Sequence, residues 1–161
     1  MEALSLADYR ARVAGIYLSN MDLAGFRRAR DVLFRTHPQS AIPEPARSSF
    51  AGLRYFPPDD AFAVDVPIRS AEGSLDIDTG GADGILHYVR AGILDTPWGP
   101  LTLWWLSAYG GGLFLPFRDG TCGRESYGGG RYLTDTVKGT HGRGVDVVAA
   151  DRVRLDFNYA Y

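Results

Sequence analysis

From residue 61 onward, short apolar stretches alternate with turns that are rich in glycine. In the first stretch, Phe62, Val64, Val66 and Ile68 alternate with smaller or polar residues, the period of a strand with one buried face. The later stretches are Leu75–Ile77, Ile85–Leu94, Leu101–Leu106, Leu113–Phe117, Glu125–Leu133 and Val153–Tyr159. Short strands joined by glycine turns predict an antiparallel meander. So many strands are expected to curl into a small β-barrel or a two-sheet sandwich, because closure or stacking buries the second face.

The N-terminal segment, residues 1–37, has a helical period instead. Its first half carries apolar residues at steps of three and four, beginning at Leu6 and Tyr9, which is typical of an amphipathic helix. Ser5 and Asp8 resemble a capping box at its start. A second helix is expected from Asp22 to the proline at Pro38, which disfavours further helix. The fold class predicted is therefore mainly β, with two N-terminal α-helices.

The second helix divides into an apolar face and a basic face. The expected buried residues are Leu23, Phe26, Ala29, Leu33 and Phe34, and the residues opposite are mostly Arg27, Arg28, Asp31 and Arg35. A row of arginines is consistent with a binding patch. We favour the simpler interpretation of a solvated helix surface with local ion pairs.

The chain is expected to form one domain over residues 1–161. A length of 161 residues suits one hydrophobic core. Prolines mark residues 38–60 as an extended connector between the helices and the meander of residues 61–161. Aromatic side chains in this connector, such as Tyr55 and Phe56, are numerous enough to anchor it to the sheet, so we do not interpret it as a domain boundary.

Composition excludes several classes of function. A net charge of −2 provides no field that would attract nucleic acid or an anionic membrane. The single cysteine, Cys122, leaves no internal disulfide and fits a reducing compartment. The N-terminus lacks a signal peptide, and the longest apolar run, Leu101–Leu106, is far too short for a bilayer. We therefore expect a cytoplasmic protein with no membrane partner and no nucleic-acid partner.

The sequence names neither a metal nor a cofactor. The three histidines, His37, His87 and His141, lie far apart and have no metal-ligand spacing. No phosphate-binding loop or dinucleotide motif is present, because the lysine of the first and the following helix of the second are missing. The cofactor is left unknown, and no metal site is expected.

The segment after Phe117 carries the strongest turn signal. Asp119 followed by Gly120 predicts a tight two-residue hairpin, because a primed turn needs positive φ at its centre. Such a hairpin places Arg118 and Glu125 on one face, about 13 Å apart along the strands, too far for a direct ion pair. A longer loop through Gly123 would change this register.

Three consecutive glycines, Gly128, Gly129 and Gly130, then stand between Tyr127 and Arg131. Glycine weakens a strand, so the run indicates a close backbone approach, a bulge or a binding loop. Backbone N–H groups and a guanidinium together suit an anion. The alternative, which we favour on the residues alone, is a bulge that bends the strand for barrel closure.

Two further strands offer candidate site residues. In the last strand, Asp156 and Asn158 share the face opposite the apolar residues, so they either meet solvent or line a polar lumen. Trp104 and Trp105 are adjacent and point to opposite faces of their strand. One of them suits the core, and the other needs a helix, an aromatic ligand wall or a partner.

Three motifs resemble a bacterial family that is known only as domain of unknown function sixteen eighty-four. They are the Phe-Arg-Asp ending at Asp119, the Glu-x-Tyr-Gly-Gly-Gly-Arg-Tyr from Glu125 to Tyr132, and the Asp-Phe-Asn-x-Ala-Tyr ending at Tyr161. The likeness implies membership and no activity. It marks Arg118, Asp119, Glu125, Tyr127, Gly128, Gly129, Gly130, Arg131, Asp156, Asn158 and Tyr161 as positions of interest. Members of that family continue into a tail with cysteine and proline, which implies that the tail is absent here and that a sheet edge is exposed.

Three hypotheses for function follow. The leading one is a small-molecule-binding β-barrel with a polar or anionic anchor, whose ligand contacts are Arg118, Glu125, Tyr127, Gly128, Gly129, Gly130, Arg131, Asp156, Asn158 and Trp104. The second is an enzyme that uses Glu125 as acid or base and Arg131 to stabilise charge. The third is a structural or interaction module without ligand, which could form a homodimer through the edge of the C-terminal strand.

Overall fold

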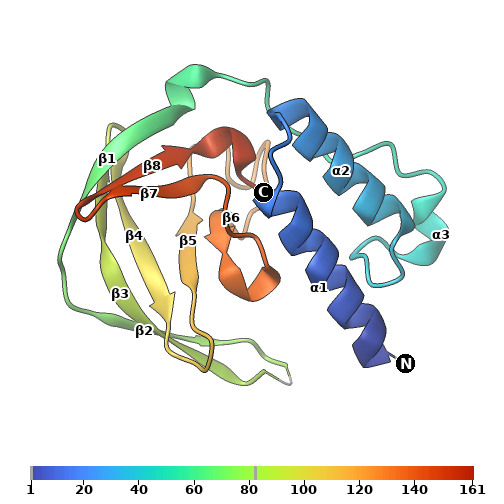
Figure 1. Cartoon of the computed structure of the whole chain (residues 1–161), viewed down its shortest axis with the longest axis horizontal. Helices are drawn as coiled ribbons and strands as arrows, with labels where there is room; N and C mark the ends of the chain where they lie inside the picture. Colours follow the sequence, from blue (N-terminus) through green and yellow to red (C-terminus); the bar gives the residue numbers. More distant parts are fainter. Residues whose placement is uncertain (1, 82) are drawn as a thin grey trace.

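The computed structural model describes residues 2–81 and 83–161 (Figure 1). Its helical elements are α1 (Glu2–Leu18), α2 (Leu23–Thr36), α3 (Glu44–Arg47), η1 (Asp60–Phe62), η2 (Thr136–Lys138) and η3 (Phe157–Tyr159), where η marks a short 3₁₀ turn. Its strands are β1 (Ala63–Arg69), β2 (Ser74–Asp78), β3 (Ile85–Thr96), β4 (Gly99–Leu106), β5 (Leu113–Phe117), β6 (Arg131–Asp135), β7 (Val145–Ala149) and β8 (Arg152–Asp156).

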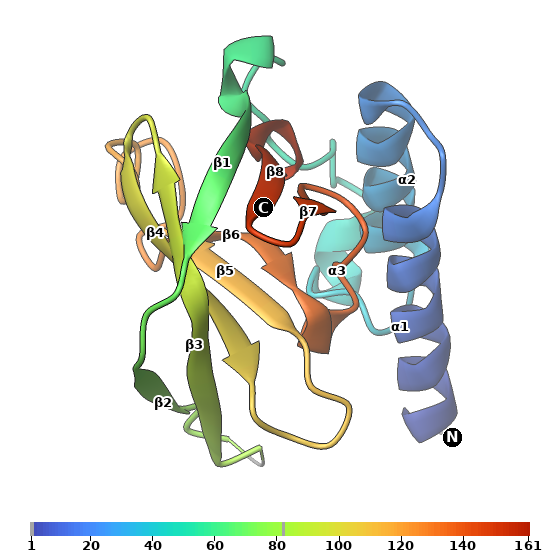
Figure 2. The same cartoon turned by 60° about the vertical axis from the view of Figure 1, so that its left-hand side comes forward.

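The strands form one curled antiparallel sheet, as the alternating sequence pattern predicted. The order across the sheet is β6-β5-β4-β3-β1-β8-β7, and β2 also pairs with β3. One edge of β3 pairs with β4, and the other edge is long enough for two partners, because its first half pairs with β2 and its end pairs with β1. Figure 2 shows the sheet wrapping as a half-barrel whose open side faces the helices. The predicted mainly-β fold class with N-terminal helices is confirmed.

The C-terminal segment departs from the predicted single strand. β8 ends at Asp156, because the Asp156 carboxylate accepts the backbone N–H of Asn158 at 3.0 Å and starts η3. β8 also lies between β1 and β7, and β7 did not appear among the predicted strands. The edge of the C-terminal strand that was expected to be free is therefore covered by β7. Beyond η3, Tyr161 exchanges two backbone hydrogen bonds with Tyr132 of β6, which ties the chain end to the other side of the sheet.

The connection between β5 and β6 also differs from the predicted hairpin. Residues 118–130 form a folded loop, and the strand expected from Glu125 begins only at Arg131. Gly120 does not have the positive φ that a primed turn requires, whereas Gly123 and Gly130 do. The reason lies in Asp119, whose carboxylate accepts the backbone N–H of Thr121 at 2.8 Å. This local turn competes with the tight hairpin and defeats it.

The helices pack together over the end of the chain. Val13, Tyr17, Phe26 and Leu33 form the centre of this second core, to which η3 contributes Tyr159. Asp22 caps α2 by accepting the N–H of Gly25 at 2.7 Å, and α2 begins at Leu23, one residue after the start that the sequence indicated. The predicted capping box at Ser5 and Asp8 is wrong, because α1 begins at Glu2. Inside the half-barrel the sheet buries its own core, formed by Val66, Leu94, Leu103, Leu115, Leu133, Val153 and Leu155.

The connector between α2 and β1 is not wholly extended. It contains the short helix α3, which begins after Pro43, a residue whose fixed φ suits a helix start. Downstream of α3 the chain runs along the open side of the half-barrel to η1 (Figure 2). This course places the connector opposite the loop of residues 118–130, where the candidate site lies.

Candidate functional site

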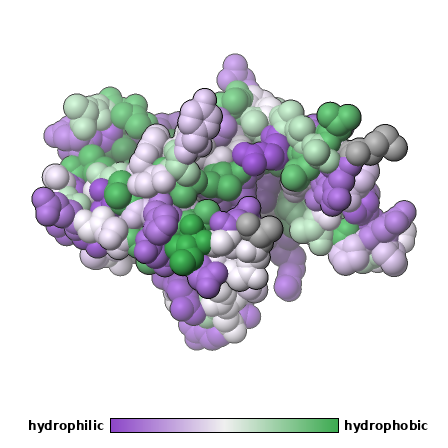
Figure 3. All heavy atoms as spheres, turned by 90° about the horizontal axis from the view of Figure 1, so that it is seen from below, coloured by the Kyte–Doolittle hydropathy of each residue, from purple (hydrophilic) through white to green (hydrophobic). Residues whose placement is uncertain are grey.

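A broad cleft of about 1760 Å³ lies between the connector and the open side of the half-barrel. Its walls come from α1 and α2, the connector, the β3–β4 turn, the loop of residues 118–130 and η3. The residues that line it include Tyr9, Arg30, Tyr55, Phe56, Phe62, Trp98, Phe117, Glu125, Arg131 and Phe157. The face seen from below mixes hydrophilic and hydrophobic side chains and is hollowed between the sheet and the helices (Figure 3).

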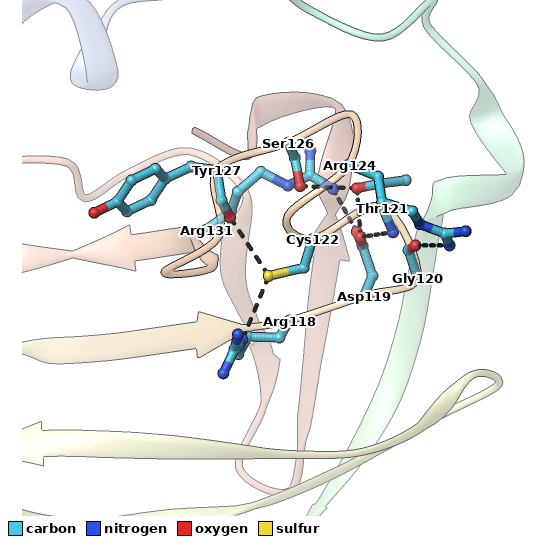
Figure 4. A network of polar contacts seen from close by, with 9 residues as sticks. All are labelled: Arg118, Asp119, Gly120, Thr121, Cys122, Arg124, Ser126, Tyr127 and Arg131. Atoms are coloured by element: carbon cyan, nitrogen blue, oxygen red, sulfur yellow. Dashed lines mark hydrogen bonds and ion pairs between the residues drawn. The ribbon is translucent and has the colours of Figure 1, made fainter.

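The loop of residues 118–130 is organised around the Asp119 carboxylate (Figure 4). One carboxylate oxygen accepts the backbone N–H and the hydroxyl of Thr121, and the other accepts Nη2 of Arg131 at 2.5 Å. Burial opposes ionisation of Asp119, but the hydrogen bonds from Thr121 and Arg131 outweigh it and lower the pKa of this carboxyl. The Phe-Arg-Asp motif thus supplies the central acceptor of the loop.

Arg118 and Cys122 connect further parts of the same loop through their side chains. Nη2 of Arg118 donates to the carbonyl of Gly128 at 2.8 Å, and its Nε donates to the Cys122 sulfur at 3.4 Å. The Cys122 thiol in turn lies 3.3 Å from the Gly128 carbonyl oxygen. Arg118 lines the cleft, yet its guanidinium already has partners within the loop (Figure 4).

The glycine run is explained in large part by internal packing. Gly130 has φ +99°, and a Cβ there would lie 2.8 Å from the carbonyl oxygen of Phe117. A Cβ at Gly129 would meet the ring of Tyr127, which is itself 80% exposed. Gly128 has open surroundings, with the Cα of Gly123 nearest at 3.8 Å. The loop therefore needs Gly130 in order to approach the end of β5.

Arg131 joins the loop to the connector. Its guanidinium carbon lies 5.2 Å from the centre of the Phe56 ring and 5.1 Å from that of Phe117, within cation–π range. The side chain is only 18% exposed and its charge is paired with Asp119. Arg131 lines the cleft but is already fixed by three groups of the protein.

Asp156 and Asn158 act as a clamp between η3 and the connector. The Asn158 side chain accepts the backbone N–H of Asp59 at 2.9 Å and donates to the carbonyl of Asp59 at 3.0 Å. Asp156 accepts both the backbone and the side-chain N–H of Asn158. The clamp holds the far wall of the cleft in register with the end of the sheet.

The predicted ligand contacts therefore separate into two groups. Those at the wall of the cleft are Arg118, Glu125, Tyr127, Gly130, Arg131 and Asn158, while Gly128, Gly129, Asp156 and Trp104 lie outside it. Trp104 packs instead with the cluster of Tyr88, Leu106 and Phe114, and Trp105 on the opposite face is exposed. The tryptophan on the cleft wall is Trp98, at the turn between β3 and β4.

The residue that the sequence interpretation missed is Arg30 of α2. It is only 7% exposed, and its Nη1 donates to the hydroxyl of Tyr55 at 3.2 Å. Its guanidinium carbon lies 5.1 Å from the centre of the Tyr161 ring, with the rings of Phe26, Phe34 and Tyr55 at 5.8 Å. Among residues 2–81 and 83–161, no carboxylate forms an ion pair with Arg30. Its spacing from Phe26 and Leu33 placed it on the apolar helix face, which was the available signal.

The tyrosines around Arg30 share a reduced acidity. Burial raises the pKa of Tyr17 to about 12 and also raises the pKa of Tyr9, Tyr55 and Tyr161, although the charge of Arg30 opposes each shift. The hydroxyl of Tyr17 is buried without a hydrogen-bond partner in the described residues. At neutral pH these hydroxyls are therefore neutral, and the charge of the group is that of Arg30.

This shift predicts a loss of stability at alkaline pH. A raised pKa in the folded state means that stability is complete below about pH 10, the unfolded value, and falls as pH rises towards 12. The loss from Tyr17 alone is about 2 kcal/mol. Urea unfolding monitored by circular dichroism across this range should show a smaller alkaline loss in Tyr17→Phe. The exposed Tyr109→Phe should match the wild type, and an unchanged loss in Tyr17→Phe would contradict the assignment.

Outside the groups around Arg30 and Asp119, the titratable side chains discussed next form no second candidate site within the described chain. His37 is buried, its Nε2 lies 3.1 Å from Asp8, and its Nδ1 accepts the N–H of Gln39, so it fastens α1 to α2. Glu125 is exposed, and its carboxylate has no hydrogen bond or ion pair within the described residues. Across residues 2–81 and 83–161, histidine, cysteine, aspartate and glutamate form no group of three that could hold a metal ion.

No helix in the same residues is long and apolar enough to cross a membrane.

Fold and cleft together define a class of protein: an antiparallel half-barrel with a helical layer and an aromatic cleft on its open side. The chain belongs to the family described as Protein of unknown function (DUF1684), whose profile matches residues 48–161. The match covers the loop of residues 118–130 and the clamp at Asp156 and Asn158. α1 and α2, with Arg30, precede it.

The chain is also similar to the solution NMR structure of an uncharacterized protein from Haloarcula marismortui. The two share 33% sequence identity with a TM-score of 0.54, over 86% of this chain and 75% of the other. No curated protein matches the chain. The comparisons thus support the half-barrel fold and the family.

Proposed function

We propose that this protein binds a small anionic molecule in the cleft, with Arg30 as its anchor. The observation that carries the proposal is a nearly buried guanidinium on the cleft wall whose described protein partners are one tyrosine hydroxyl and several aromatic rings. Five N–H donors surround a guanidinium, and Tyr55 accepts only one of them. Among the described residues the other donors form no hydrogen bond, and because Arg30 lines the cleft they can serve a carboxylate or phosphate oxygen there.

Energetics support an anion at this position. Burying a charge without a counter-charge is costly, so buried arginines are usually paired. The aromatic rings around Arg30 offset part of this cost through cation–π contacts, and an anionic ligand offsets more. The same walls present apolar surface with few polar groups, which is the usual composition of a small-molecule site.

The two alternatives lack a comparable observation. For catalysis by Glu125, a perturbing neighbour or a positioned partner is needed, and the Glu125 side chain is exposed without one among the described residues. The charge stabiliser of that hypothesis, Arg131, is already paired with Asp119. For a homodimer through the C-terminal strand, a free edge is needed, and β7 covers that edge.

Titration calorimetry with three probes tests the proposal: acetate, benzoate and inorganic phosphate. At least one is expected to bind, and Arg30→Gln should weaken that binding by about tenfold or more. Arg28→Gln is the matched control, because Arg28 is an exposed arginine of the same helix. Glu125→Gln should also leave the affinity unchanged.

Two results would contradict the proposal. One is the absence of binding for all three probes, and the other is equal affinity in the wild type and Arg30→Gln. Arg30→Lys guards against a folding defect, because it keeps a charge at the position. A folded Arg30→Lys protein that binds more tightly than Arg30→Gln supports Arg30 as the anchor.

A further inference from the structure

Aromatic rings continue the cleft well beyond Arg30. We call Phe56, Phe62, Trp98, Phe117 and Phe157 the aromatic wall. Neighbouring rings of this wall contact one another in a row. The distances between ring centres are 5.2 Å for Phe117 and Phe157, 5.5 Å for Phe157 and Trp98, and 5.3 Å for Trp98 and Phe62. The guanidinium of Arg131 bridges Phe117 to Phe56, and Phe56 follows Tyr55, the partner of Arg30. The wall and the anchor therefore line the same cleft.

The wall also leaves apolar surface open to solvent. Trp98 is 52% exposed, and Phe56 and Phe62 are exposed as well. Large aromatic residues gathered at one hollow mark a binding surface more often than scattered ones do. Contact of these rings with water is unfavourable in the free protein. Covering them with an apolar group removes that contact and is therefore favourable.

Three cationic side chains along this wall already have partners within the protein. Arg131 is paired with Asp119, and Arg27 donates to the carbonyls of Phe56 and Asn158. Lys138, which also lines the cleft, is paired with Asp135 at 3.2 Å. A sugar or nucleotide needs several polar partners, and these three side chains are already engaged, which among the described residues leaves the exposed side chains of Arg54 and Glu125 as the unpaired charges of this part of the cleft.

These observations differ between two parts of the cleft. Around Arg30 the cleft holds a buried charge whose described hydrogen bond is to Tyr55, whereas the aromatic wall presents apolar rings. We infer that the ligand is a single-headed amphiphile, a long-chain carboxylate whose headgroup meets Arg30 and whose acyl chain lies along the aromatic wall. This inference rests on the proposed function and adds the class of ligand to it.

The test is a chain-length series of butanoate, octanoate and dodecanoate, each kept below its micelle concentration and titrated calorimetrically into the wild-type protein. Each methylene that enters the wall adds hydrophobic burial, so the affinity is expected to rise by about tenfold for two methylenes. The gain should continue from butanoate to dodecanoate. An affinity that stays flat along the series would overturn the inference.

Two tryptophan variants locate the acyl chain. Trp98→Ala removes part of the wall and should weaken dodecanoate by about tenfold while leaving butanoate unchanged. Trp105→Ala is the matched control, because Trp105 is a comparably exposed tryptophan of β4 outside the cleft. Equal losses in the two variants would place the chain elsewhere and overturn the inference.

Arg30→Gln separates this inference from the proposed function. If butanoate and dodecanoate bind equally well and both are weakened in Arg30→Gln, the anchor stands and the acyl-chain inference falls. If neither is weakened in Arg30→Gln, both fall. A steep chain-length dependence together with loss in Arg30→Gln supports both. Dodecanol, which has the chain without the charge, should bind wild type and Arg30→Gln alike.

Discussion

Replacing Gly130 by alanine is expected to lower the free energy of unfolding by about 3 kcal/mol. The residue has φ +99°, a conformation that side chains with a Cβ rarely adopt, and the new Cβ would lie 2.8 Å from the carbonyl oxygen of Phe117 and 2.9 Å from the Cγ of Arg118. Both contacts are too short, and the first is with backbone that cannot move without disturbing β5. Equilibrium urea unfolding of the variant measures the loss.

Gly128→Ala is the matched control within the same run. Gly128 does not have positive φ, and a Cβ at this position would have its nearest neighbour 3.8 Å away. An alanine there should change the free energy of unfolding by no more than about 0.5 kcal/mol. Losses of equal size at the two positions would show that the run serves something other than the close approach at Gly130.

The strands of the sheet were predictable because the signal for each strand lies within its own residues. Alternation such as that of Val64 and Val66 in β1 reports directly which face is buried, and the antiparallel pairing of β3 with β4 follows from their short connection. The curl was expected because it buries the second face of the sheet. α2 was predictable for the same reason, since Asp22 and Pro38 bound a periodic segment. β7 escaped because its residues are mostly exposed, which leaves no clear alternation to detect.

The loop of residues 118–130 was not predictable from its turn signal. Asp119 and Gly120 are the residues of a primed hairpin turn, but the Asp119 side chain bonds Thr121 and Arg131 instead. The Arg131 guanidinium that pairs with Asp119 also packs on Phe56 of the connector. A contact between segments so far apart in sequence leaves no local pattern.

The candidate site shows the same division between residues that a local motif reveals and residues that only the tertiary structure reveals. Arg118, Glu125, Tyr127 and Arg131 were identified from their motif, and the structure brings all four to the cleft. Arg30 was hidden because an arginine on an apolar helix face is normally interpreted as an exception to the pattern. Only the tertiary packing of α2 against η3 and Tyr55 reveals that its charge is buried beside a cleft.

Asp119→Ala is expected to lower the free energy of unfolding by about 3 kcal/mol near neutral pH. The change removes two hydrogen bonds from Thr121 and leaves the Arg131 guanidinium between two phenyl rings without its counter-charge. The carboxylate is 37% exposed, so solvent moderates the loss relative to a fully buried pair. Asp151→Ala is the control, because the Asp151 side chain is exposed and makes no hydrogen bond within the described residues.

The pH dependence provides an independent check on this effect. The pKa of Asp119 is lowered in the folded state, so its contribution is present above about pH 4, the unfolded value, and is lost as pH falls through the folded value. Wild type and Asp119→Ala should therefore converge in stability below about pH 4. If the difference between them stays constant across that range, the loss comes from packing and not from the ionised carboxylate. If Arg131→Met costs nothing further in the Asp119→Ala background, while it is destabilising on its own, the two side chains act as one unit that holds the loop against the connector.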